Sequence, residues 1–407
     1  MRRLAFAAAC LMLGATAPAA PDFLLEGDAP PTARYLTGGV EPFAPATQAR
    51  LDARRGIVSL GINTAWLVDS GIAREPFANG ILAVADAVER GETPGAVILL
   101  RRPLGEMLPI AAGWMMTDPQ RAHAQYSTRY ELGELTGLAT ALPIALGALM
   151  EGRLDAESTL DSHLPWLAGT ALGGRTVGDA LRHRTGLPGE IGLDGEPTPE
   201  RARAALAAAP LGEPGFSRHN DLLLGLVLSQ VYQEPAQVLA RERLFAPLGM
   251  AETSFGAQGD RYRIAPGSYS NFRGRLAWGE TEDPLAAAFG GDALSGGLVS
   301  TAEDLGRLAV ALVAMMRQGG GDAEQWEGAL ARGGFGEGSI GRDGAEGCSL
   351  WLLPDEWVVL VYLSNQAHPT PAAPVDPRPA AFKELRAAVE PWDAAVLEAP
   401  PAGAAAP

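Results

Sequence analysis

Apolar positions along this chain follow the helical period in some segments and form short continuous runs in others. Residues 81–90 carry apolar side chains at the spacing of one helix face, which predicts a helix. A Gly- and Pro-containing break at 91–95 ends that pattern, and the apolar run 96–100 then predicts a strand. Four further helices are predicted over residues 140–150, 221–232, 237–245 and 303–316.

Two more apolar runs, 348–352 and 358–364, stand close together near the C-terminal end and predict a pair of strands. Strands at both ends with helices between them are typical of an α+β fold. We expect the N- and C-terminal strands to share one antiparallel sheet. The mostly helical middle would then form the opposite wall of a cleft.

The two ends of the chain differ from this central pattern. Residues 1–19 resemble a secretory signal peptide, with Arg2 and Arg3 before an apolar run and a small-residue site at Ala17-Pro18-Ala19. Residues 20–75 form a leader segment rich in Pro and Gly, with one short helical pattern at 46–55. The globular domain is predicted over 76–369. The tail, 370–407, is rich in Pro and Ala, with one short helix around 382–389.

Composition limits the compartment and the partners. The signal predicts an exported, periplasmic protein with no membrane span after cleavage, because the apolar run is too short to span. Few apolar residues precede Cys10, which argues against a lipoprotein, and Cys348 is then the only cysteine, so no internal disulfide can form. A net charge of −16 argues against nucleic acid and anionic lipid as partners.

Several sequence blocks resemble one family in the same order along residues 77–369. They are Glu92–Val97, Tyr130–Gly137, Gly152–Asp155, Leu181–Pro188, Leu244–Met250 and Gly347–Asn365. This chain is similar to the serine β-lactamases and penicillin-binding proteins, in particular to their esterase- and carboxypeptidase-like branch. The resemblance implies a β-lactamase/transpeptidase-like fold with an antiparallel sheet, flanking helices and a mostly helical subdomain.

The catalytic positions implied by that resemblance are altered. The family's Ser-x-x-Lys becomes Glu134 and Gly137, so the nucleophilic hydroxyl and the activating amine are both missing. The chain has one lysine, Lys383, and Ala380 stands three residues before it, so no other Ser-x-x-Lys exists. A shifted alignment therefore cannot restore the pair.

The second and third family motifs also depart from their pattern. The tyrosine of the second motif falls on Phe216, which has no hydroxyl, or on Arg218, which cannot act as a base. The third motif becomes Arg342-Asp343-Gly344, in which a carboxylate replaces the hydroxyl. The Tyr269-Ser270-Asn271 sequence spells the second motif, but it lies in the wrong order along the chain.

Two hypotheses follow for function. The first is a catalytically degenerate protein that binds a small molecule, a cell-wall fragment or a protein. The second is an active hydrolase of esters, amides or peptidoglycan-like substrates at a non-standard site, for example with Glu134 and Asp343 as an acid–base pair in one cleft. Against that pair, we expect Glu134 to form a salt bridge with Arg342 or Arg218. The scattered histidines lack metal-ligand spacing, and the sequence predicts neither a metal nor a cofactor.

Overall fold

The computed structural model describes residues 43–58, 72–102, 109–270, 273–317, 326, 328–369 and 375–389. The predicted signal peptide, Cys10 and the end of the tail lie outside these residues. Within the described ranges, no helix is both long and apolar enough to cross a membrane.

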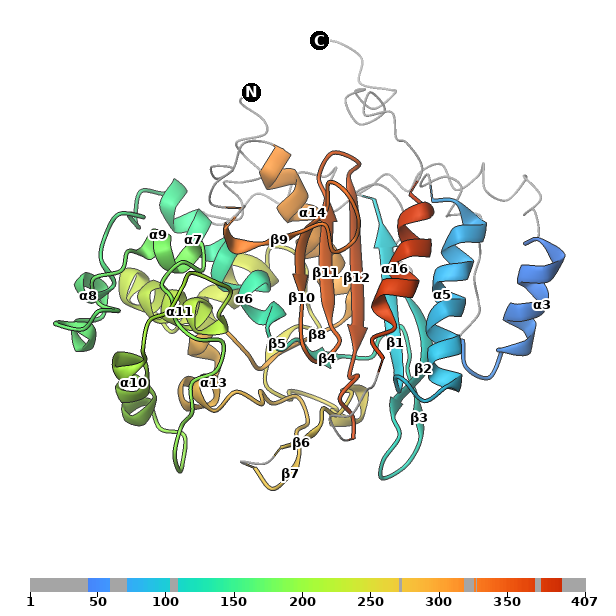
Figure 1. Ribbon diagram of the computed structural model, residues 1–407, viewed down its shortest axis with the longest axis horizontal. Helices are drawn as coiled ribbons and strands as arrows, with labels where there is room; N and C mark the ends of the chain where they lie inside the picture. The colour runs from blue at the N-terminus through green and yellow to red at the C-terminus, as the bar shows by residue number, and fades with distance from the viewer. Residues whose placement is uncertain are drawn as a thin grey trace, which may run out of the picture.

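A seven-stranded antiparallel sheet forms the centre of the fold, in the order β3-β2-β1-β12-β11-β10-β9 (Figure 1). Strand β1 pairs with β12 along its length, with Ala96 opposite Ser364 and Arg101 opposite Val359. This pairing confirms the predicted sheet built from both ends of the domain. The strands are β1 Gly95–Arg101, β2 Ile110–Met116, β3 Ala122–His123, β9 Ala331–Arg332, β10 Ile340–Asp343, β11 Ser349–Leu353 and β12 Val358–Ser364.

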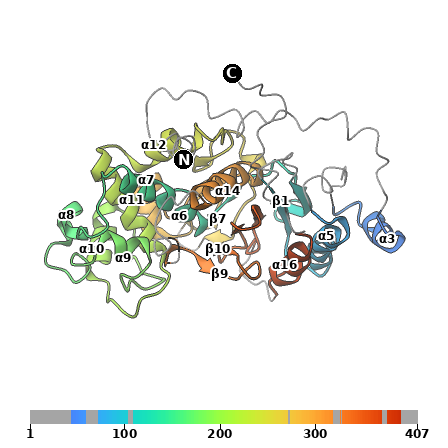
Figure 2. The ribbon, with the colours of Figure 1, turned by 90° about the horizontal axis from the view of Figure 1, so that it is seen from above.

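Both faces of this sheet are covered, which explains why β1 and β12 are apolar throughout rather than alternating. Ala96, Ile98 and Leu100 of β1 join the core under α5 (Arg74–Glu89) and α16 (Arg378–Ala387). Val97 and Leu99 point to the opposite core, which α14 (Ala302–Arg317) covers. Figure 2 shows α14 on one side of the sheet and α5 with α16 on the other.

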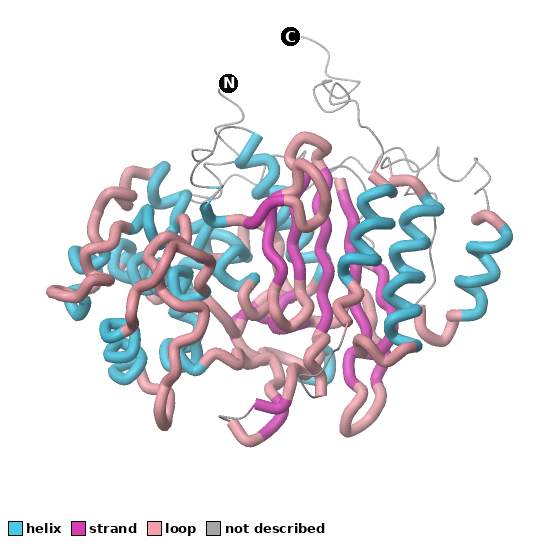
Figure 3. The backbone as a smooth tube through the Cα atoms, viewed as in Figure 1, coloured by secondary structure: helices cyan, strands magenta, loops and turns pink. Residues whose placement is uncertain are grey.

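The chain between β2 and α14 supplies most of the helices, which lie beside one edge of the sheet (Figure 3). Short strands in the same region are β4 Tyr130–Glu131, β5 Ser254–Phe255, β6 Tyr269–Ser270, β7 Arg275–Leu276 and β8 Leu298–Ser300. The helices are α6 Leu135–Ala139, α7 Ala141–Met150, α8 Leu160–His163, α9 Val177–Leu181, α10 Pro199–Ala208, α11 Arg218–Tyr232, α12 Ala236–Ala240 and α13 Pro284–Phe289.

Local sequence accounts for where several helices begin. Ser217 precedes α11, and its hydroxyl accepts the backbone N–H of His219. Thr301 precedes α14 and accepts the backbone N–H of Asp304 at 3.2 Å. The cap at Ser217 bears on the candidate site, because α11 carries residues of that site.

The described parts of the leader and the tail pack on the domain. Helix α3 (Pro45–Ala53) lies beside α5, where Leu51 contacts Ala78 and Leu82. Helix α16 buries Phe382 and Leu385 against the sheet. These segments therefore contribute to the core, although the sequence assigned them outside the globular domain.

Candidate functional site

The residue at the family's serine position, Glu134, stands directly before α6 and faces the neighbouring edge of the sheet. Its carboxylate Oε1 lies 3.6 Å from Nη2 of Arg218, the first residue of α11. Both side chains are only partly exposed, at 18% for Glu134 and 26% for Arg218. The predicted salt bridge is confirmed, with Arg218 rather than Arg342 as the partner of the carboxylate.

Gly137, at the family's lysine position, faces Asp221 of α11 at very short range. A Cβ atom added to Gly137 would lie 2.1 Å from both Cγ and Oδ2 of Asp221. Such distances are impossible for real side chains, so no residue larger than glycine fits here unless Asp221 moves. The carboxylate of Asp221 therefore fills the space into which a lysine at this position would extend.

Arg342, from the third motif, holds this carboxylate in place. Its Nη1 donates to Asp221 Oδ2 at 2.8 Å and to the backbone carbonyl of Glu134 at 2.9 Å. Its Nη2 donates to Nε2 of His183 at 3.0 Å and to the backbone carbonyl of Ala329 at 3.1 Å. The side chains of Arg342 and Asp221 are 6% and 3% exposed. The buried ion pair ties the sheet to α6 and α11.

His183 completes this network as a neutral ring. Its Nε2 faces the Arg342 donor, so that nitrogen must accept, and the proton sits on Nδ1, which lies 3.0 Å from the carbonyl of Ser217. Burial lowers the pKa of His183 to about 4, with Asp221 opposing this effect and Arg342 adding to it. The ring is thus uncharged at neutral pH and cannot compete with Arg342 for Asp221.

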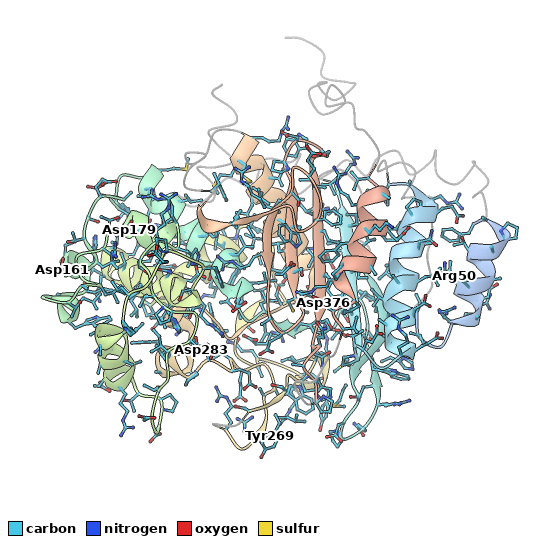
Figure 4. The ribbon with its side chains drawn as sticks, in the orientation of Figure 1. Arg50, Asp161, Asp179, Tyr269, Asp283 and Asp376 are labelled. Atoms are coloured by element: carbon cyan, nitrogen blue, oxygen red, sulfur yellow. The ribbon has the colours of Figure 1, made fainter. Side chains whose placement is uncertain are left out.

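Phe216, at the tyrosine position, covers the network from outside. The Arg342 guanidinium carbon lies 4.6 Å from the centre of its ring, and the His183 ring centre lies 4.8 Å away. The ring is 46% exposed and carries no group that can relay a proton. Tyr269 does not substitute for it, because Tyr269 lies on the separate β6–β7 hairpin (Figure 4) and donates its hydroxyl to the Gly274 carbonyl.

The proposed acid–base pair of Glu134 and Asp343 is wrong. Neighbouring residues of a strand point to opposite faces of a sheet, and Arg342 takes the face toward α6. Asp343 consequently points the other way, where Oδ1 accepts from Trp351 Nε1 at 2.8 Å and lies 3.9 Å from Arg378 of α16. The two carboxylates do not share a cleft.

A small cavity of about 80 Å³ lies beside Glu134 and was not predicted. Gly344, from the third motif, lines it together with Ser295. Its other polar residues are mainly acidic: Glu131, Glu134, Glu282, Asp283 and Glu346, with Arg218. One indication of this cavity was present in the sequence: Glu131 lies just before the first motif and Glu346 lies just after the third.

Burial and mutual repulsion act strongly on two of these carboxyl groups. Burial, with a contribution from the charge of Glu346, raises the pKa of Glu131 to about 8, and the backbone N–H groups of Gly133 and Gly297 act in the opposite direction. Burial likewise raises the pKa of Glu346 to about 7, with Glu282 adding to the effect. The cavity therefore disfavours the negative charge that its own side chains carry when ionised.

We expect Glu346→Gln to stabilise the protein at alkaline pH. A carboxyl group whose pKa rises on folding, here from 4.5 to about 7, favours folding below pH 4.5 and loses that advantage as the pH rises through 7. The neutral amide avoids this loss, so the variant should gain about 3 kcal/mol at pH 8 and nothing at pH 4. Urea unfolding at both pH values measures the difference. Exposed Glu157, changed to Gln, is the control, and an equal gain at both pH values would contradict the assignment.

Comparison with known proteins identifies the fold and the family. The β-lactamase family model matches residues 82–384. A class C β-lactamase from Rhodobacter sphaeroides is 19% identical, with 75% of this chain and 98% of that chain covered and a TM-score of 0.56. A β-lactamase/D-alanine carboxypeptidase from Pseudomonas syringae is 17% identical, with 76% and 98% covered and a TM-score of 0.57.

A third similar structure is EstCE1, described as a hydrolase with promiscuous acyltransferase activity. It is 19% identical, with 75% of this chain and 98% of that chain covered and a TM-score of 0.54. A sequence search of curated proteins gave no significant match. At these identities the solved structures establish the fold, and the family model covers most of the chain. The chain belongs to the β-lactamase family.

Proposed function

We propose that this protein is a catalytically silent member of the β-lactamase family that binds a ligand or organises a partner through its altered cleft. The observation that carries this proposal is the position of Asp221. Its carboxylate, paired with Arg342, fills the space next to Gly137 where an activating amine would have to stand. A nucleophile at position 134 would thus find a carboxylate already paired with Arg342 in place of a free amine.

The remaining side chains around Glu134 support the same conclusion. The Glu134 carboxylate is engaged by Arg218, and the Arg342 guanidinium is satisfied by four acceptors. Phe216 has no proton to relay. In a comparable triad hydrolase, loss of the serine or the base alone lowers kcat by about a millionfold. Here the corresponding groups are all replaced, and the cleft keeps its polar residues for binding.

Export to the periplasm is the second part of the proposal, and it rests on the pattern of residues 1–19. We expect the full-length gene product to appear in the periplasmic fraction with residue 20 at its N-terminus. Intact-mass measurement of the purified protein tests this directly. Retention of residues 1–19 in a cytoplasmic fraction would contradict export, and a lipid-modified Cys10 would show that it is a lipoprotein instead.

We expect no covalent labelling by a fluorescent β-lactam and no hydrolysis of an activated ester above the buffer rate. The reason is that, in the described structure, the hydroxyls that line the cavity, those of Thr281 and Ser295, have no hydrogen bond to a basic side chain. Gel fluorescence and ester absorbance measure the two reactions, with an active class C β-lactamase as the positive control. Ester turnover that Glu134→Gln abolishes would establish the alternative, a hydrolase with a carboxylate nucleophile. A trapped acyl adduct on any cleft residue would equally refute the proposal that the protein is catalytically silent.

A further inference from the structure

The carboxylates around the cavity beside Glu134 come from three segments that are distant in sequence. They are β4 with the turn that leads to α6, the segment before α13, and the turn between β10 and β11, and Arg218 and Ser295 complete the lining. Asp283, labelled in Figure 4, belongs to the second segment, next to the helical part of the fold. Each segment contributes at least one carboxylate, so negative charge approaches the cavity from several sides.

Positive charge does not balance these carboxylates. Arg218 is the one cationic side chain that lines the cavity, and it already pairs with Glu134. Among the described residues, Glu131 accepts only the backbone N–H groups of Gly133 and Gly297. Arginines act on the other two carboxylates through their charge, Arg273 and Arg275 on Glu282 and Arg218 on Glu346. A buried carboxylate without a partner loses several kcal/mol of hydration energy. The site thus has a deficit of positive charge that an occupant could supply.

A second observation points to a ligand independently of charge. Ser295 is 2% exposed and lines the cavity, yet its hydroxyl has no hydrogen-bond partner within the described structure. Asp283, 6% exposed, uses Oδ1 to accept the backbone N–H of Leu285, and its Oδ2 makes no hydrogen bond but lies 3.9 Å from Nε2 of the buried His219. Buried polar groups are normally satisfied, so the Ser295 hydroxyl in particular indicates a missing partner.

We propose that this cavity binds a small organic cation through a primary ammonium group. An ammonium has three donors and no acceptor, which suits separate oxygens on different sides of a small space. A metal ion fits less well, because no group of three potential ligands converges anywhere in the described ranges. The volume of about 80 Å³ suits a charged head with a short carbon chain and is small for a drug-sized ligand.

This inference assigns a ligand class to the binding role proposed above and rests on it. Isothermal titration of the full-length protein with n-butylamine at pH 8 tests the cation directly. n-Butanol has nearly the same shape without the charge, and tetramethylammonium has the charge without N–H donors. We expect one n-butylamine to bind per chain and both comparison compounds to bind at least tenfold more weakly. Nα-acetyl-lysine methylamide then distinguishes a free amine from an amine carried on a peptide.

Variants assign the binding to this cavity. Glu346→Gln should weaken n-butylamine binding about tenfold or more, and Ser295→Ala should weaken it severalfold. Glu157→Gln, the same change on an exposed residue, should leave the affinity unchanged. Because Glu346→Gln is expected to be more stable than the parent at pH 8, its loss of binding cannot be attributed to unfolding, and thermal unfolding checks this.

Several outcomes would overturn the inference: no saturable binding, equal binding of the uncharged or quaternary compound, or full affinity in Glu346→Gln. These outcomes differ from a failure of the proposed function. If the protein neither binds n-butylamine nor reacts with the β-lactam, it is still catalytically silent, and its ligand belongs to another class. A chain that is labelled by the β-lactam is an enzyme, whatever its affinity for amines.

Discussion

Replacing Arg342 by alanine is expected to destabilise the fold by about 3–5 kcal/mol. The substitution leaves the Asp221 carboxylate 3% exposed without its cation, and it leaves two backbone carbonyls and His183 Nε2 without their donor. Urea unfolding at pH 7.5, followed by circular dichroism, gives the free energy. A protein of ordinary stability has about 5–15 kcal/mol in total, so the variant should unfold at a much lower urea concentration.

Arg263→Ala is the matched control for this variant. Arg263 faces Glu252 at 3.4 Å, but the two side chains are 45% and 41% exposed, so this pair should contribute less than about 1 kcal/mol. The double variant Arg342→Ala, Asp221→Ala should lose less stability than the two single variants added together, because neither charge is then left unpaired. A loss below 1 kcal/mol in Arg342→Ala would show that the buried pair is not a structural element.

Gly137→Ala is expected to destabilise the protein by about 3 kcal/mol or more. The new methyl group would overlap Asp221 at 2.1 Å, and Asp221 cannot retreat without breaking its bond to Arg342. Thermal and urea unfolding measure the loss. Gly189→Ala is the control, because a Cβ there meets no atom within 4 Å. Tolerance of alanine at both positions would contradict the close packing that the proposed function depends on.

The same geometry predicts the outcome of restoring the family motif. A double variant with Glu134→Ser and Gly137→Lys carries the hydroxyl and the amine of the Ser-x-x-Lys motif in its sequence. We expect it to remain inactive toward the labelled β-lactam, because the lysine would have to enter the space that Asp221 occupies. Acylation of this double variant would show that Asp221 can move aside.

Periodicity and motif order predicted much of this fold. The apolar runs at 96–100 and 358–364 correspond to β1 and β12, whose pairing depends only on both being apolar on two faces. The salt bridge of Glu134 followed from a general rule, that a partly buried carboxylate requires a nearby cation. Such rules use local composition and need no knowledge of long-range contacts.

The sequence did not show which way the side chains point or which residues far apart along the chain come into contact. Strand alternation separates Arg342 from Asp343, but only the packing of α6 and α16 decides which of them faces the cleft. Asp221 was not recognised, because its role arises from contact with Gly137, a residue far away along the chain. The acidic cavity was missed for the same reason: its carboxylates come from three segments that meet only after folding.

The contact between Gly137 and Asp221 also bears on how this lineage can evolve. A lysine at position 137 requires a smaller residue in place of Asp221. That replacement would leave Arg342 without its carboxylate partner, and replacement of Arg342 would leave Asp221 without its cation. Each single change at position 137, 221 or 342 is therefore expected to destabilise the protein, so these three residues can be exchanged only as a set.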